Sequence, residues 1–87
     1  MEIIIKDKAE DDMSFWNKSG NKQVLKKIEN LIKDINAHPE TGIGKPEKLK
    51  HELSNFWSRH ITENHRIVYK IVNDELHIIS LRGHYDK

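Results

Sequence analysis

The sequence predicts an α+β domain in which two helices pack against one small antiparallel sheet, in the order β-α-α-β-β-β. Apolar residues recur at helical spacing in the first half of the chain. Three short β-type runs, separated by turn residues, fill most of the second half. The 87 residues fit one small domain, so we expect residues 1–87 to form a single folded unit.

The chain is expected to begin with a strand and a helix. Ile3–Ile5 is a short β-branched run, which is consistent with a buried strand. Asp7 and Glu10 have the spacing of a capping box, in a position where acidic side chains favour the start of a helix. A first helix is therefore predicted over residues 8–18, and Gly20 is expected to end it.

A second helix is predicted over residues 22–37. Pro39 limits it, because the residue before a proline is disfavoured in the helical conformation. Residues 40–48 then contain glycines and a proline, which predicts an exposed loop. The apolar stripe of this helix comprises Val24, Leu25, Ile28, Leu31, Ile32 and Ile35.

Three antiparallel strands are predicted over residues 56–62, 65–72 and 75–81. The short segments between them are typical of tight turns. Side chains alternate between the two faces of a strand, so one face of the second run packs on the helices and Arg66 points away from them.

Charge is balanced over the chain and uneven along it. There are 15 basic and 14 acidic residues, so net charge alone does not indicate a nucleic-acid binder. Residues 42–70 nevertheless carry an excess of basic side chains, which favours a phosphate-rich ligand on one face. There is no cysteine, which excludes disulfides and thiolate zinc sites, and the apolar run Ile3–Ile5 is too short for a signal peptide or a membrane span. A cytoplasmic protein is expected.

Glu47 and Arg66 are candidate site residues in the basic region. A glutamate beside a phosphate-binding patch can act as a general base. An arginine can hold a phosphate and stabilise the charge that develops during phosphoryl transfer. Taken singly, each has an ordinary alternative: a solvated loop acid for Glu47 and a surface charge for Arg66.

His84 and Tyr85 are further candidates near the end of the chain. A histidine can give a proton to a leaving oxygen near neutral pH, and a tyrosine can stack on a base or hydrogen-bond to a phosphate. The alternative is a frayed chain end. The six histidines show no convincing ligand spacing, so neither a metal nor a cofactor is predicted.

Three segments, taken in order, resemble the YoeB/Txe branch of the RelE toxin superfamily: GKPEKLKHEL, then FWSRHITENHRIVY, then a His-Tyr pair near the end. The resemblance runs through nearly the whole chain. It implies a RelE-like fold of two helices on an antiparallel sheet. It also implies an endoribonuclease that cleaves messenger RNA in the ribosomal A site without a metal.

The resemblance further implies a role for each candidate residue. Glu47 corresponds to the general base, Arg66 to the phosphate-stabilising arginine, His84 to the general acid and Tyr85 to a supporting aromatic residue. Four basic residues are expected to contact RNA: Lys45, Lys50, Arg59 and His60. The chain departs from the family pattern at His60, where relatives can have an arginine, and at Asp86 and Lys87, which follow the tyrosine.

The partners implied by the resemblance are the ribosome with its messenger RNA and a YefM-like antitoxin, and a toxin homodimer is allowed. DNA lacks the 2′-hydroxyl, so no DNA cleavage is expected. DNA binding by the toxin alone is not expected either. Two alternatives stay open. ParE-type toxins use a similar fold to inhibit gyrase by binding, and a plain interaction module would leave the candidate residues incidental.

Overall fold

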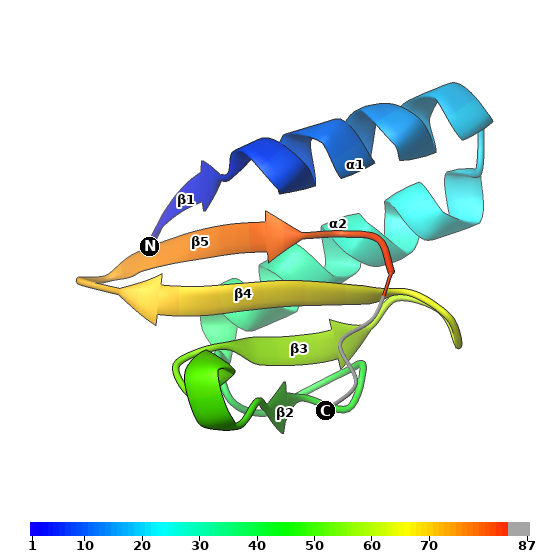
Figure 1. The fold of residues 1–87 in the computed structure, drawn as a ribbon. Helices are drawn as coiled ribbons and strands as arrows, with labels where there is room; N and C mark the ends of the chain where they lie inside the picture. The colour runs from blue at the N-terminus through cyan, green and yellow to red at the C-terminus, as the bar shows by residue number, and fades with distance from the viewer. Residues whose placement is uncertain (84–87) are drawn as a thin grey trace.

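The computed structural model describes residues 1–83 (Figure 1). Its five strands form one sheet in the order β1-β5-β4-β3-β2, antiparallel except for the parallel pair β1 and β5. Two helices complete an α+β fold, which confirms the predicted class. In chain order the elements are β1 (Glu2–Ile5), α1 (Asp7–Ser19), α2 (Lys22–Ala37), β2 (Glu47–Lys48), the 3-10 helix η1 (His51–Leu53), β3 (Trp57–His60), β4 (Arg66–Val72) and β5 (Glu75–Ser80).

Both helices begin and end close to the predicted residues. The Asn21 side chain accepts a hydrogen bond of 3.1 Å from the Val24 N–H and so caps the start of α2. Gly20 ends α1 in the left-handed conformation, at φ 69°. The predicted capping box was wrong: Asp7 is already helical, and Lys6 holds the cap position without a side-chain hydrogen bond.

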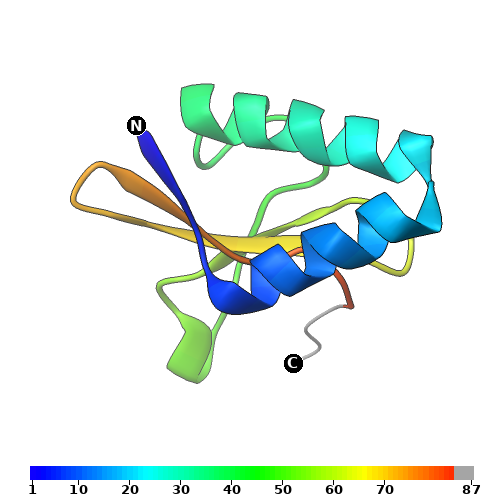
Figure 2. The ribbon, with the colours of Figure 1, turned by 90° about the horizontal axis from the view of Figure 1, so that it is seen from above.

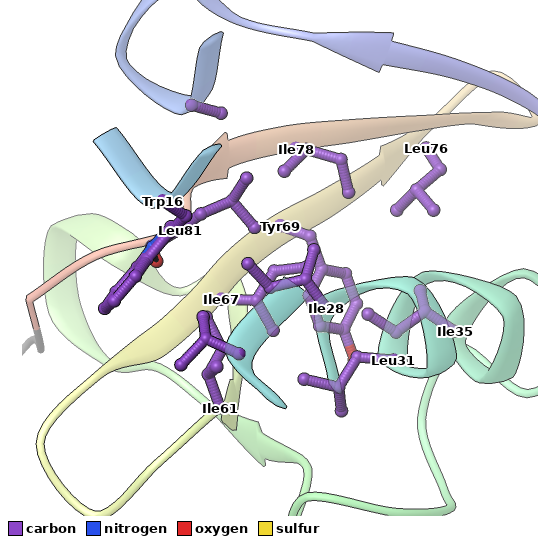
Figure 3. Close-up of a cluster of buried hydrophobic side chains, with 12 residues drawn as sticks. Trp16, Ile28, Leu31, Ile35, Ile61, Ile67, Tyr69, Leu76, Ile78 and Leu81 are labelled. Carbon is purple, nitrogen blue, oxygen red and sulfur yellow. Dashed lines mark hydrogen bonds between the residues drawn. The ribbon is translucent and has the colours of Figure 1, made fainter. Parts of the chain in front are cut away.

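The core lies between the helices and the sheet, and α2 runs across one sheet face (Figures 1 and 2). Figure 3 shows the apolar side chains of α2 directed toward those of β4 and β5. Leu31, Ile35, Ile67 and Tyr69 are fully buried. In a domain this small the core is thin, so each of these side chains contributes strongly to stability.

β1 differs from the buried strand that was predicted. Ile3 and Ile5 remain 42% and 39% exposed. The physical reason is position, because β1 is at the edge of the sheet and pairs only with β5. A β-branched run in the sequence does not distinguish an edge strand from a central one.

The predicted loop at residues 40–48 also contains a short strand. Glu47 and Lys48 form β2, which pairs with Ser58 and Trp57 of β3, so Glu47 is held by the sheet rather than by a loop. On the other side of β3 lies β4, where His60 pairs with Arg66. These pairings place β2 and β4, which carry Glu47 and Arg66, on the two sides of β3.

Neither helix within residues 1–83 has both the length and the apolar character that crossing a membrane requires.

Candidate functional site

Glu47 and Arg66 form an ion pair on the sheet face turned away from the core. Nη1 of Arg66 lies 3.0 Å from Oε1 of Glu47 and donates a second hydrogen bond of 3.2 Å to Oγ of Ser58. The strand register explains the contact, because Ser58 lies opposite Glu47 on β2 and two residue pairs from the His60–Arg66 pair, on the same face of the sheet. Arg66 therefore reaches across β3 to the acid on β2.

The exposure of the two side chains differs. The side chain of Glu47 is 58% exposed and that of Arg66 is 21% exposed. Ser58, which accepts from Arg66, is fully buried. Arg66 is thus fixed against the sheet, while the Glu47 carboxylate stands at the surface. A carboxylate that can accept a proton, beside a guanidinium that can hold an anion, is suited to acid–base chemistry at a phosphate.

Two of the predicted RNA-contacting residues line one surface hollow. Lys45 and His60 border it together with Lys27 of α2 and Glu63. A backbone hydrogen bond brings Lys45 and His60 close together: the His60 N–H donates at 2.7 Å to the carbonyl of Gly44, the residue before Lys45. Lys27 was not among the predicted residues, and its only signal in the sequence is that it lies off the apolar stripe of α2.

Lys50 is exposed at the start of η1, three residues after Glu47. His60 is partly exposed and lies opposite Arg66 in the β3–β4 register. Lys45, Lys50 and His60 are therefore accessible to an external ligand.

Arg59 occupies a different environment from the other predicted RNA contacts. Its side chain is 0% exposed, because it shares the core-facing side of the sheet with Ile67 and Tyr69. An RNA contact through its guanidinium does not fit this burial. The guanidinium donates instead to Asp34, to the hydroxyl of Tyr69 and to the backbone carbonyls of His38, Thr41 and Ile43.

This buried arginine perturbs two neighbouring side chains. The Arg59 hydrogen bond to Asp34, at 2.6 Å, lowers the pKa of that carboxyl below its usual value, and the Ile43 N–H adds to the effect. Burial raises the pKa of Tyr69 above its usual value, and the Arg59 guanidinium partly opposes that rise. Since Arg59 binds three carbonyls between residues 38 and 43, it holds the segment that leads into β2.

The predicted general acid His84 and its neighbour Tyr85 lie outside the described residues. Gly83, the last described residue, lies beside Arg66, because the Arg66 N–H donates a hydrogen bond of 2.8 Å to the Gly83 carbonyl. Within residues 1–83 no group of three or more His, Asp or Glu side chains is arranged to hold a metal ion.

Comparison with known proteins identifies the family. Residues 5–85 match the family model described as "YoeB-like toxin of bacterial type II toxin-antitoxin system". The chain is 48% identical over 85 residues to Toxin YoeB of Escherichia coli strain K12, which covers 98% of this chain and 100% of that protein. The fold is therefore that of toxins of bacterial toxin–antitoxin systems, and this chain is a member of the YoeB-like toxin family.

Solved structures agree with this assignment. The YoeB/ParE toxin from Agrobacterium tumefaciens superposes with a TM-score of 0.93 at 36% identity, covering 98% of this chain and 100% of that one. A YoeB dimer from Staphylococcus aureus gives a TM-score of 0.87 at 36% identity, covering 98% of each chain. The toxin chain of a YoeB-YefM complex from Staphylococcus aureus gives 0.86 at 37% identity, again covering 98% of each chain.

Proposed function

We propose that this toxin is an endoribonuclease that cleaves messenger RNA in the ribosomal A site and so inhibits translation. The observation that carries the proposal is the surface pair of Glu47 and Arg66, an acid and a guanidinium joined at 3.0 Å in a basic region. Membership of the YoeB-like family supports a toxin with this chemistry.

In the proposed reaction the nucleophile belongs to the RNA itself. Glu47 takes the proton of a ribose 2′-hydroxyl, and the 2′-oxygen attacks the adjacent phosphorus. Arg66 stabilises the negative charge that develops on the phosphoryl oxygens. The bond to the 5′-oxygen breaks, and His84 gives that oxygen a proton. The step needs no metal and no cofactor, and DNA is not cut because it lacks the 2′-hydroxyl.

The remaining candidate residues bind the RNA in this proposal. Lys45, Lys50 and His60 are accessible and contact the RNA backbone, whose phosphates favour basic side chains. Tyr85 supports the reacting nucleotide as the neighbouring aromatic residue. Arg59 is left out of this group because it is buried and hydrogen-bonded within the protein.

We also propose the partners that this activity requires. The Staphylococcus aureus complex supports a YefM-like antitoxin as the neutralising partner, and the Staphylococcus aureus dimer supports a homodimer. The substrate is messenger RNA on the ribosome, which places the toxin in the cytoplasm. Because this messenger RNA is bound to the ribosome when it is cut, the ribosome is a second macromolecular partner.

Primer extension on a translated messenger RNA with purified ribosomes tests the function. Wild type is expected to cut inside the A-site codon, and His84→Gln is expected to cut about 10²–10⁴-fold more slowly. His38→Gln, the same substitution at an exposed residue after α2, is the control and should cut like wild type. No cuts by folded wild type during active translation would overturn the nuclease proposal and favour a toxin that acts by binding, such as a gyrase inhibitor.

A further inference from the structure

Both backbone polar groups of Gly83 form hydrogen bonds with residues at the start of β4. Its N–H donates a hydrogen bond of 2.9 Å to Nδ1 of His65. Its carbonyl accepts a hydrogen bond of 2.8 Å from the N–H of Arg66. Two consecutive residues of the chain, His65 and Arg66, therefore hold the residue that immediately precedes His84.

The ring of His65 is itself positioned by α1. The indole of Trp16 meets it edge to face, with 5.0 Å between the ring centroids and 89° between the planes. Trp16 is buried, and its Nε1 donates a hydrogen bond of 2.9 Å to the Leu81 carbonyl. In Figure 3 the Trp16 and Leu81 side chains lie side by side. The contact that orients His65 and the contact that holds Leu81 thus come from one side chain.

A second residue of α1 completes this attachment. Asp12 is only 4% exposed, and its Oδ2 accepts a hydrogen bond of 2.8 Å from the Leu81 N–H. The segment from Leu81 to Gly83 is consequently bonded to α1 at one end and to β4 at the other. Hydrogen bonds of this kind hold the segment in place, because each buried polar group would be left without a partner if the segment shifted.

The hydrogen bond to Gly83 also defines the form of the His65 ring. A ring nitrogen can accept a hydrogen bond only when it carries no proton, so the contact with the Gly83 N–H requires a His65 ring without a proton on Nδ1. In this form His65 acts as a fixed acceptor. It is not placed to exchange a proton with a substrate through Nδ1, because that atom is occupied by the Gly83 N–H.

We propose that His65 is a positioning residue for the cleavage reaction. By holding Gly83 it fixes the backbone of the residue that immediately precedes His84 in the sequence. This inference rests on the proposed function, since it assigns a role toward the general acid of that reaction. It acts through geometry: displacing a catalytic group by about 1 Å can reduce a rate by about 10²-fold.

Two substitutions form a matched test, because both remove the ring and keep a polar side chain. In His65→Asn the amide oxygen occupies the place of Nδ1 and can still accept from Gly83. In His65→Gln the terminal amide lies near the place of Nε2, so it cannot accept the hydrogen bond from the Gly83 N–H. Single-turnover cleavage by His65→Gln is expected to be about 10–10²-fold slower than by His65→Asn, with little change in KM.

A double-mutant cycle separates positioning from general damage. If His65 acts through His84, then His65→Gln should slow cleavage strongly in the wild-type background and hardly at all in the His84→Gln background. Equal losses in both backgrounds, or equal rates for His65→Asn and His65→Gln, would overturn the positioning role. Absence of cleavage by wild type would instead overturn the proposed function and, with it, any role of His65 in the reaction.

Amide hydrogen exchange at Gly83 examines the anchor without an activity assay. The Gly83 amide should be protected in wild type and in His65→Asn, and it should exchange about tenfold or more faster in His65→Gln. Equal exchange in the three proteins would show that the Nδ1 bond does not hold Gly83, and the inference would fail even if the toxin cleaves RNA.

Discussion

Arg66 of β4 and Glu47 of β2 meet at 3.0 Å although β3 lies between their strands. The contact is made over Ser58, which accepts a second hydrogen bond from the same Arg66 nitrogen. The residues proposed as base and phosphate binder are thus fixed relative to each other by the sheet. The segment that leads into β2 and Glu47 is held separately from the interior, where Arg59 donates to the carbonyls of Thr41 and Ile43.

The first prediction concerns the proposed base. Glu47→Gln should reduce cleavage by about 10²–10⁴-fold, because the amide cannot take the 2′-hydroxyl proton. Stability should change by about 1 kcal/mol or less, since the Glu47 side chain is 58% exposed. Primer extension and urea unfolding measure the two quantities. Glu52→Gln, at an exposed residue of η1, is the control, and equal cleavage by both variants would remove Glu47 from the chemistry.

Arg66→Lys tests whether the guanidinium itself is needed. Lysine keeps the charge but cannot bind a phosphate through two parallel hydrogen bonds. Single-turnover cleavage should fall by about 10²-fold at saturating ribosomes, and circular dichroism should remain that of wild type. A lysine variant that cleaves at the wild-type rate would show that charge alone suffices at this position.

The sequence predicted α2 well because its signal is local. An apolar stripe at helical spacing and a following proline determine where such a helix lies, and the structure places it at Lys22–Ala37. The contact between Glu47 and Arg66 could not be predicted in this way. Their pairing depends on a two-residue strand, β2, which is too short to have a pattern of its own.

Arg59 shows a different limit of sequence reasoning. The sequence indicates an arginine beside a basic segment, which is the ordinary description of a surface residue. Its burial follows from the strand alternation that places it with Ile67, combined with carbonyl acceptors that only the folded loop supplies. Such acceptors are backbone groups, so residue types do not reveal them.

The third prediction follows from that burial. Arg59→Met should lower the free energy of unfolding by about 3–5 kcal/mol, because Asp34 and the loop carbonyls lose their donor. Urea denaturation measures the change. Lys26→Met, at an exposed residue of α2, is the matched control and should stay within about 0.5 kcal/mol of wild type. If both variants unfold alike, the Arg59 network does not stabilise the fold.

The fourth prediction is a pH dependence that comes from Asp34. Its pKa is lower in the folded chain than in the unfolded chain, so the ionised carboxylate stabilises the fold above the unfolded value of about 3.9. This contribution is lost as the pH falls through the lower, folded value. The difference between the melting temperatures of wild type and Asp34→Asn should therefore be largest near pH 6–7 and should begin to shrink only as the pH falls below about 4.

Asp11→Asn is the control for that experiment, because Asp11 is exposed on α1. Its melting temperature should follow wild type across the same pH range. A constant difference between wild type and Asp34→Asn at every pH would mean that the ionisation of Asp34 is not what stabilises the loop.

The last prediction uses the close approach of Gly42 to the Asp34–Arg59 ion pair. Gly42 has φ +125°, and a Cβ atom there would lie 1.9 Å from Oδ2 of Asp34. Gly42→Ala therefore requires the carboxylate to leave Arg59 and also strains the backbone, with an expected loss of about 3 kcal/mol or more. Gly20→Ala is the matched control: its φ of +69° is also unfavourable, but nothing lies within 4 Å of the added atom. It should lose only about 1–2 kcal/mol.

The Asp34→Ala background distinguishes the collision from the backbone strain. With the carboxylate removed, Gly42→Ala should cost less than in the wild-type background, because the contact at 1.9 Å is gone while the backbone strain remains. The free energies of unfolding of the four proteins in this cycle, measured in urea, give the coupling directly. A coupling near zero would mean that the Gly42 position is limited by its backbone alone, and that the loop before Glu47 does not depend on the fit between Gly42 and Asp34.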